Sequence, residues 1–231
     1  MRLDTLAELN RARAMRQAAV VITDLAGGKT DVLLEGDIDN HPLAEQLRKA
    51  LRSGKASLVE NAEGARFLNP YLPPAKIVVI GAVHISQALA RLAPVAGYDL
   101  TIIDPRTAFA TEERFTGVEL LADWPEEVLK TRPLDKYTAL VAVTHDPKID
   151  DFAVSEALNV GCFYVGALGS RKTHANRVEI LKEMGHDSQA IDRIAAPIGL
   201  DIGASSPAEI AVAILAQIIQ ALRQRDLRPA D

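Results

Sequence analysis

Short apolar runs alternate with amphipathic segments through the second part of the chain, from about residue 73 onward. The runs are rich in β-branched residues and are continuous rather than alternating, which is typical of parallel strands buried on both faces. The segments between them have the apolar spacing of helices, ending with an apolar helix over 207–223. This pattern predicts a doubly wound, Rossmann-like α/β domain. The expected strands are KIVVI (76–80), DLTIID (99–104), ALVAV (139–143), CFYVG (162–166) and a short one at PIGLDI (197–202), with a short apolar stretch, VELL (118–121), after the second of them.

The first part of the chain has a different pattern. Its expected elements are a helix over 1–17, a β-hairpin over 18–36, a helix over 41–55 and a short strand over 56–60. Three prolines follow, Pro70, Pro73 and Pro74, and proline is not expected inside a central strand or a helix. We therefore predict a domain boundary there, between a small α+β domain (1–72) and the Rossmann-like domain (73–231).

Composition and charge narrow the class of protein. The formal net charge is −5 and the sequence has no basic block, which disfavours a nucleic-acid surface. Cys162 is the single cysteine, so a disulfide framework and a cysteine-based zinc site are excluded, and no metal site is predicted. The N-terminus lacks the apolar core of a signal peptide, and no apolar segment approaches the ~20 residues of a membrane span. We expect a soluble cytoplasmic protein, and the apolar last helix favours a homodimer.

The turn after the first strand of the Rossmann-like domain, GAVHIS, is the first candidate binding element. Gly81 suits a tight turn, and the helix that follows offers free N–H groups and a positive dipole end to an anion. Val83 stands where the G-x-G-x-x-G fingerprint has its second glycine, so close approach of a pyrophosphate is disfavoured. His84 lies at the helix start, as a ligand contact or simply as a solvated residue.

The next strands end in further polar residues. Asp104 has about the spacing of an acidic residue that meets a ribose hydroxyl, and the guanidinium of Arg106 suits a phosphate. Alternatively, Asp104 only opens a turn before its proline. Thr144, His145 and Asp146 could bind a polar ligand, although their spacing is not a known metal pattern.

Two later loops complete the candidate site. Gly169 frees the backbone, Ser170 can cap the next helix, and Arg171 can reach an anion held at that helix start. Asp201, between two glycines, is harder to explain by packing. Because ligands of doubly wound sheets bind at the carboxyl ends of the strands, all these residues are predicted to contribute to one site.

Five sequence blocks in order resemble the C-terminal Rossmann domain of the xanthine dehydrogenase accessory protein family (XdhC/CoxI), from about residue 66 to 223. The resemblance implies a protein that binds molybdenum cofactor, as molybdopterin or its cytidine dinucleotide form. It further implies protection of the cofactor during sulfuration, with a cysteine desulfurase as possible partner, and delivery to an apo molybdoenzyme of the xanthine dehydrogenase class. The blocks are FLNPYLPPAKIVVIGAVH, TIIDPRTAFATEERF, THDPKIDD, YVGALGSRKTHANR and PIGLDIGASSPAEIAVAILAQI.

Two features depart from the family pattern. Family members often begin the turn G-A-G-H, whereas this chain has Val83 before His84. The family's N-terminal domain usually carries a Gly-Cys pair, but residues 1–65 contain no cysteine. Cys162, at the start of an expected buried strand, is interpreted as a core residue.

Two further functions stay open beside a non-catalytic chaperone. One is an NAD(P)-dependent oxidoreductase on the same fold, since fold does not fix chemistry. The other is a regulatory protein that senses a nucleotide. The sequence shows no obvious acid–base pair for an oxidoreductase. In addition, Val83 crowds the position where the pyrophosphate of NAD(P) would bind.

Overall fold

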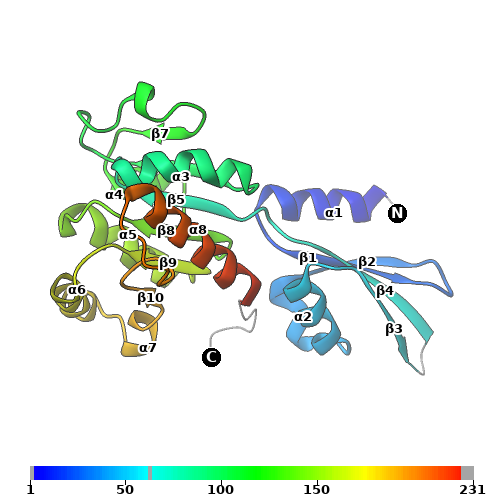
Figure 1. The fold of residues 1–231 in the computed structure, drawn as a ribbon. Helices are drawn as coiled ribbons and strands as arrows, with labels where there is room; N and C mark the ends of the chain where they lie inside the picture. Colours follow the sequence, from blue (N-terminus) through cyan, green and yellow to red (C-terminus); the bar gives the residue numbers. More distant parts are fainter. Residues whose placement is uncertain (1–2, 62–63, 225–231) are drawn as a thin grey trace. The chain divides into compact units, whose positions relative to one another are not determined.

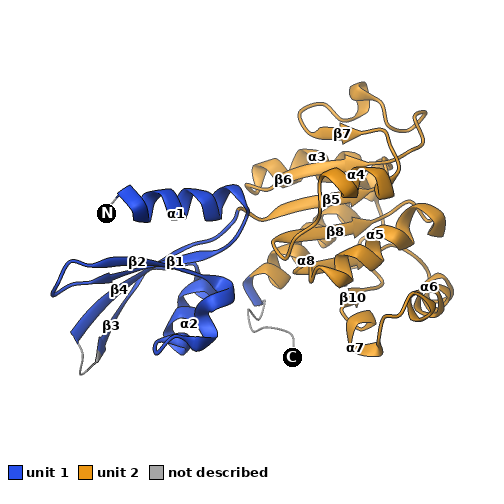
Figure 2. Ribbon diagram, turned by 180° about the vertical axis from the view of Figure 1, so that it is seen from behind, with its two compact units in different colours: residues 1–73, 223–231 blue, residues 74–222 orange. Residues whose placement is uncertain are grey.

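The computed structural model describes residues 3–61 and 64–224, without the side chain of residue 61. The chain divides into two compact units (Figure 1, Figure 2). One comprises the described residues up to Pro73 together with Arg223 and Gln224, and the other comprises Pro74–Leu222. Each unit has a sheet and a hydrophobic core of its own.

The N-terminal unit is a four-stranded antiparallel sheet with helices, so the predicted α+β class is confirmed. The sheet order is β2-β1-β4-β3, and α1 packs against β2 while α2 packs against β4 and β1. On the α1 side, Leu9 and Ala12 form a small core with Ala19 and Val21. The elements are α1 (Leu3–Ala14), β1 (Ala19–Asp24), β2 (Thr30–Leu34), η1 (Glu35–Asn40), α2 (Ala44–Ser53), β3 (Ser57–Asn61) and β4 (Gly64–Tyr71).

The expectation that Pro70 lies outside a central strand is wrong. Pro70 belongs to β4, where it pairs with Val20 of β1. Proline is tolerated because β3 pairs with β4 only as far as Leu68. The proline nitrogen, which has no hydrogen to donate, can therefore face the side without a partner strand.

Residues 74–222 form the predicted doubly wound α/β unit, with six parallel strands in the order β10-β9-β8-β5-β6-β7. This is the Rossmann order, with a switch point between β5 and β8, from which the chain continues in opposite directions along the sheet. The strands are β5 (Lys76–Ile80), β6 (Asp99–Ile103), β7 (Glu119–Leu121), β8 (Thr138–Ala142), β9 (Tyr164–Ala167) and β10 (Ile194–Ala195).

Helices cover both faces of this sheet. Ile77 and Val79 of β5 point into the core beneath α3 and α8, whereas Val78 and Ile80 point into the core beneath α4, α5 and α6. Because successive strand residues face opposite sides, one apolar run serves both cores. The helices are α3 (His84–Val95), η2 (Glu112–Arg114), α4 (Pro125–Thr131), α5 (Pro147–Asn159), α6 (Arg171–Glu183), α7 (Ser188–Ile191) and α8 (Pro207–Gln224).

The last predicted strand lies elsewhere. β10 is Ile194–Ala195, and residues 197–202 form an irregular loop instead. Gly199 explains the loop, since it has φ +93° and its N–H donates to Gln217 Oε1 at 2.8 Å. A Cβ at this position would lie 3.1 Å from that of Ala213, so the loop lies directly against α8.

Three sequence expectations concern cysteine, metals and membranes. Cys162 is fully buried just before β9, and burial raises the pKa of its thiol to about 12, as suits a core residue. Within residues 3–61 and 64–224, histidine, cysteine and acidic side chains form no group of three that could hold a metal ion. None of the helices described has the length and apolarity needed to cross a membrane.

Candidate functional site

The turn after β5 lies directly against the loop after β8, at the switch point of the sheet. Gly81 has φ +119°, a conformation that disfavours a side chain. A Cβ on Gly81 would lie 2.8 Å from Thr144 Cγ2 and 3.1 Å from the Thr144 backbone nitrogen. Glycine is therefore needed both for the turn and for this close approach, which brings two predicted site residues together.

The N-terminus of α3 has no side-chain cap. Val83 is its N-cap and supplies no side-chain hydrogen bond, and His84 is exposed in the first turn. By contrast, Asp146 and Ser170 cap α5 and α6 by accepting from Lys148 N and Thr173 N. The first N–H groups of α3 thus lack the side-chain cap that the two neighbouring helices have.

Val83 itself has an ordinary extended backbone, with φ −104°, so this position does not require glycine. Its side chain is half-buried and packs against the core beneath α3. The exclusion of a pyrophosphate by Val83 stays a prediction.

Asp104 is fully buried and holds two loops together. Its Oδ2 accepts from Ala82 N (2.7 Å) and Arg106 Nη2 (2.7 Å), and its Oδ1 accepts from Arg106 N and Nε (both 2.9 Å). Burial alone would raise the pKa of Asp104, but the hydrogen bonds from Arg106 and Ala82 outweigh it and lower the pKa. Arg106 stacks on Phe109, with its guanidinium carbon 4.8 Å from the ring centre. Both carboxylate oxygens of Asp104 thus already accept hydrogen bonds from the protein itself, without a ligand.

The loop after β8 is held in an unusual conformation. His145 is exposed and has φ +64°, which is uncommon for a residue other than glycine. Thr144 is buried, and its Oγ1 accepts from Asp146 N at 3.0 Å. This bond, which spans His145, fixes the loop and leaves the imidazole on the surface.

The remaining predicted residues lie farther along the sheet. Gly169, Ser170 and Arg171 follow β9, one strand beyond β8, and Arg171 is exposed in the first turn of α6. Asp201 is exposed in the loop that follows the edge strand β10. The structure therefore joins the residues after β5, β6 and β8 by direct contacts, with Arg171 one strand away and Asp201 at the far edge.

The family profile described as "XdhC Rossmann domain" matches residues 77–218. The chain belongs to the XdhC family. The family assignment thus confirms the resemblance carried by the five sequence blocks, and the matched residues are those of the doubly wound sheet. The site described above lies entirely within them.

Relatives share this part of the chain. A protein of Bacillus subtilis (strain 168), named as a probable xanthine dehydrogenase subunit, is 31% identical over 155 residues, covering 67% of this chain and 45% of the relative. The "Molybdenum cofactor insertion chaperone PaoD" of Escherichia coli (strain K12) is 28% identical over 148 residues, covering 64% and 40%. The match therefore spans less than half of each of these relatives.

A solved structure shares the fold. The crystal structure titled as a xanthine dehydrogenase from Bacillus halodurans has a TM-score of 0.67 at 22% identity. The match covers 96% of this chain and 67% of the other. At this identity the likeness supports the fold alone.

The sequence reasoning missed one cluster in this XdhC-family chain, made by Asp150, Asp151 and Arg177. Arg177 Nε donates to Asp151 Oδ1 at 2.7 Å, and its Nη2 lies 3.6 Å from Asp150 Oδ2. Asp150 also accepts from Thr144 N at 3.4 Å, which links the cluster to the loop after β8. Burial raises the pKa of Asp150 to about 6. The available signal was the position of Arg177 four residues before the buried Leu181, on the inner side of α6.

Proposed function

We propose that this chain binds molybdenum cofactor at the carboxyl edge of its Rossmann sheet and helps to insert it into an apo molybdoenzyme of the xanthine dehydrogenase class. The observation that carries the proposal is the uncapped start of α3 at the switch point, in a chain of the XdhC family. Free N–H groups at a helix start suit the phosphate that such a cofactor carries. The names of the relatives, one of them a molybdenum cofactor insertion chaperone, support the same role.

The residues around α3 fit an anionic ligand. His84 is exposed in the first turn of α3, and Arg171 is exposed at the start of α6, which follows β9, two strands from β5 along the same edge. A charged contact from Arg171 would hold the phosphate more tightly than a single bond from His84. In this proposal the chain's own residues bind and orient the cofactor, and the molybdenum chemistry belongs to the enzyme that receives it. Sulfuration, the cofactor form, a desulfurase partner, a homodimer and the cytoplasmic location stay predictions.

The geometry supports an NAD(P)-dependent oxidoreductase less well. In that function an acidic side chain at the end of the second strand accepts hydrogen bonds from a ribose. Asp104 holds this position, but it is fully buried and its two oxygens already accept four hydrogen bonds.

The proposal is tested by retention of molybdenum cofactor on purified variants. Arg171→Ala should weaken retention by about ten- to a hundredfold, because a charge-assisted hydrogen bond contributes about 1.5–3 kcal/mol. His84→Ala should weaken it less, since an uncharged hydrogen bond contributes about 1 kcal/mol. Arg91→Ala, an exposed arginine near the far end of α3, is the matched control and should retain the cofactor fully. Equal retention by all three variants would place the phosphate elsewhere.

A further inference from the structure

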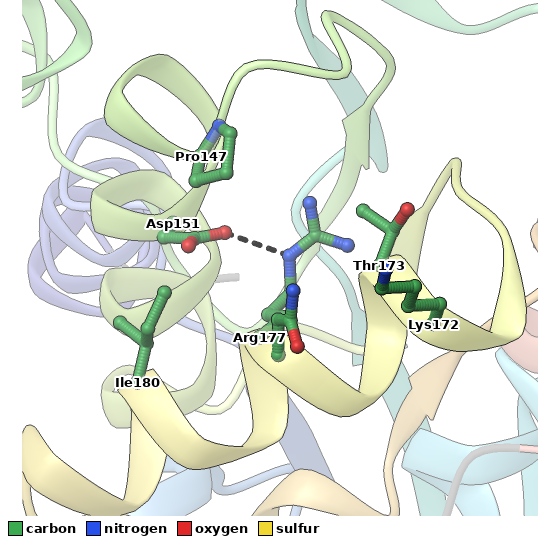
Figure 3. A pocket seen from close by; sticks show the side chains of 7 residues that line it. Pro147, Asp151, Lys172, Thr173, Arg177 and Ile180 are labelled. Carbon is green, nitrogen blue, oxygen red and sulfur yellow. Dashed lines mark hydrogen bonds and ion pairs between the residues drawn. The ribbon is translucent and has the colours of Figure 1, made fainter.

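A pocket of about 190 Å³ lies between the N-terminal parts of α5 and α6, beside the predicted site residues but lined by others (Figure 3). Its walls come from helices that follow the neighbouring strands β8 and β9. The lining residues are Pro147, Asp151, Lys172, Thr173, Asn176, Arg177 and Ile180. In Figure 3 the Arg177 guanidinium extends from α6 toward α5, with Asp151 on one side and Thr173 on the other.

Two buried side chains of this pocket have unsatisfied hydrogen-bonding atoms. Arg177 is 2% exposed and Asp151 is 5% exposed. Although they bond to each other, Arg177 Nη1 and Asp151 Oδ2 have no hydrogen-bond partner within the described structure. Buried polar atoms without partners are rare in folded proteins, because each one costs about 1–3 kcal/mol. A polar ligand bound in the pocket would explain both atoms.

The unsatisfied atoms specify the chemistry of that ligand. Arg177 Nη1 is a donor and requires an acceptor, whereas Asp151 Oδ2 is an acceptor and requires an N–H or O–H. A lactam edge, with N–H beside C=O, offers the two complementary groups side by side. Pro147 and Ile180 add apolar surface to the walls, which suits a flat ring.

Size and charge favour this ligand over simple ions. A cavity of roughly 150 Å³ accepts benzene, so about 190 Å³ suits one ring or a small fused pair. A free phosphate would meet the carboxylate of Asp151, with Asp150 behind it, and a divalent cation would meet Arg177. Lys172, exposed and part of the pocket lining, can pair with an anionic substituent that extends from the ring toward solvent.

We propose that this pocket binds a planar nitrogen heterocycle through its lactam edge and, given the proposed function, that the heterocycle is the pterin ring of the cofactor. The 2-amino-4-oxo ring of a pterin presents N–H donors to Asp151 and a carbonyl oxygen to Arg177. The phosphate end would then extend along the same sheet edge toward α3. This assignment rests on the proposed function for the identity of the heterocycle, whereas the two unsatisfied atoms call independently for a ligand that offers an acceptor beside an N–H or O–H.

The experiment titrates the purified chain with 6-hydroxymethylpterin, which has the ring but no phosphate, and follows pterin fluorescence. Asn176→Trp places a bulky side chain at the pocket without removing the buried ion pair, and it should weaken pterin binding at least tenfold. Ala175→Trp adds the same bulk at an exposed position of α6 outside the pocket lining, and it should bind normally. 3-Methylpterin, which lacks the N–H of the lactam, should also bind at least tenfold more weakly.

The outcomes separate this proposal from the proposed function. Absence of pterin binding, or equal binding by the two tryptophan variants, would overturn the pocket assignment even if the chain retains whole cofactor. Equal binding of pterin and 3-methylpterin would overturn the lactam contact. Pocket-dependent pterin binding in a chain that retains no molybdenum cofactor would support the pocket and contradict the proposed function.

Discussion

Two Asp–Arg clusters with buried carboxylates lie at the same edge of the Rossmann sheet, and they differ in how completely their atoms are paired. Asp104 and Arg106, after β6, form a closed cluster in which each carboxylate oxygen accepts two hydrogen bonds. Asp150, Asp151 and Arg177, between α5 and α6, form an open cluster in which each side chain has an atom with no hydrogen-bond partner among the described residues. The pKa values follow this difference, since that of Asp104 is lowered and that of Asp150 is raised.

The comparison shows that a buried ion pair alone does not indicate a binding site. The closed cluster satisfies itself and holds the turn after β5 to the end of β6, so its role is structural. The open cluster carries a desolvation cost that its own atoms do not compensate. Unsatisfied atoms beside a pocket, rather than charge or burial, are therefore the feature that points to a ligand.

Asp104→Ala should have the largest effect on stability. It removes a buried partner of Arg106 and leaves the Ala82 N–H without its acceptor, so we expect a loss of about 3 kcal/mol in the free energy of unfolding. Urea denaturation measures this loss. Asp104→Asn, which keeps one acceptor oxygen, should lose less. A loss below about 1 kcal/mol in the alanine variant would mean that the closed cluster does not stabilise the fold.

Asp150→Asn should have the opposite effect on stability and raise the free energy of unfolding at pH 8. The pKa of Asp150 is raised from 3.8 to about 6, so ionisation of this carboxyl weakens the fold as the pH rises from about 4 to 6. Asparagine stays neutral, and the variant should gain up to about 3 kcal/mol at pH 8 relative to the unaltered chain, with no gain at pH 4.

Urea denaturation at several pH values measures this difference. Asp99→Asn, at an exposed aspartate, is the control and should show no such gain at pH 8. Destabilisation of Asp150→Asn at pH 8 would show instead that the ionised Asp150 is well paired, contrary to the open cluster described above.

Phe109→Ala should have the smallest effect. It removes the ring on which Arg106 stacks, and a cation–π contact at an exposed site contributes about 0.5–1 kcal/mol. The four hydrogen bonds to Asp104 stay in place, so the loss in urea denaturation should remain within that range. A loss as large as that of Asp104→Ala would mean that the ring, rather than the carboxylate, holds Arg106.

Hydropathy predicted most of the fold, because parallel strands such as Lys76–Ile80 are apolar on both faces and stand out in the sequence. It failed at Pro70, where tolerance depends on the point at which a neighbouring strand stops pairing. Hydropathy also placed the last strand at 197–202 instead of Ile194–Ala195, because the conformation of Gly199 depends on contact with α8, which is far away in the sequence. Both errors concern contacts that a local pattern cannot contain.

The sequence predicted which loops contribute to the candidate site, but not which side chains bond to one another there. The rule that ligands bind at strand carboxyl ends selected the loop of Gly81 and that of Thr144, and the structure brings them together. The sequence did not show that Arg106 occupies the Asp104 carboxylate. It also did not show that Arg177, in a helix with a polar sequence, is buried. Pairing between distant charges leaves no periodic signal, so only the folded structure shows it.

The central claim is tested most directly by measuring what the purified chain binds. The chain is incubated with molybdenum cofactor and, separately, with NADH and NADPH. After gel filtration, molybdenum and oxidised pterin are quantified per chain, and nicotinamide is quantified by absorbance. We expect molybdenum and pterin to stay with the protein in equal amounts and neither nicotinamide cofactor to be retained. Retention of NADH or NADPH without molybdenum and pterin would contradict it.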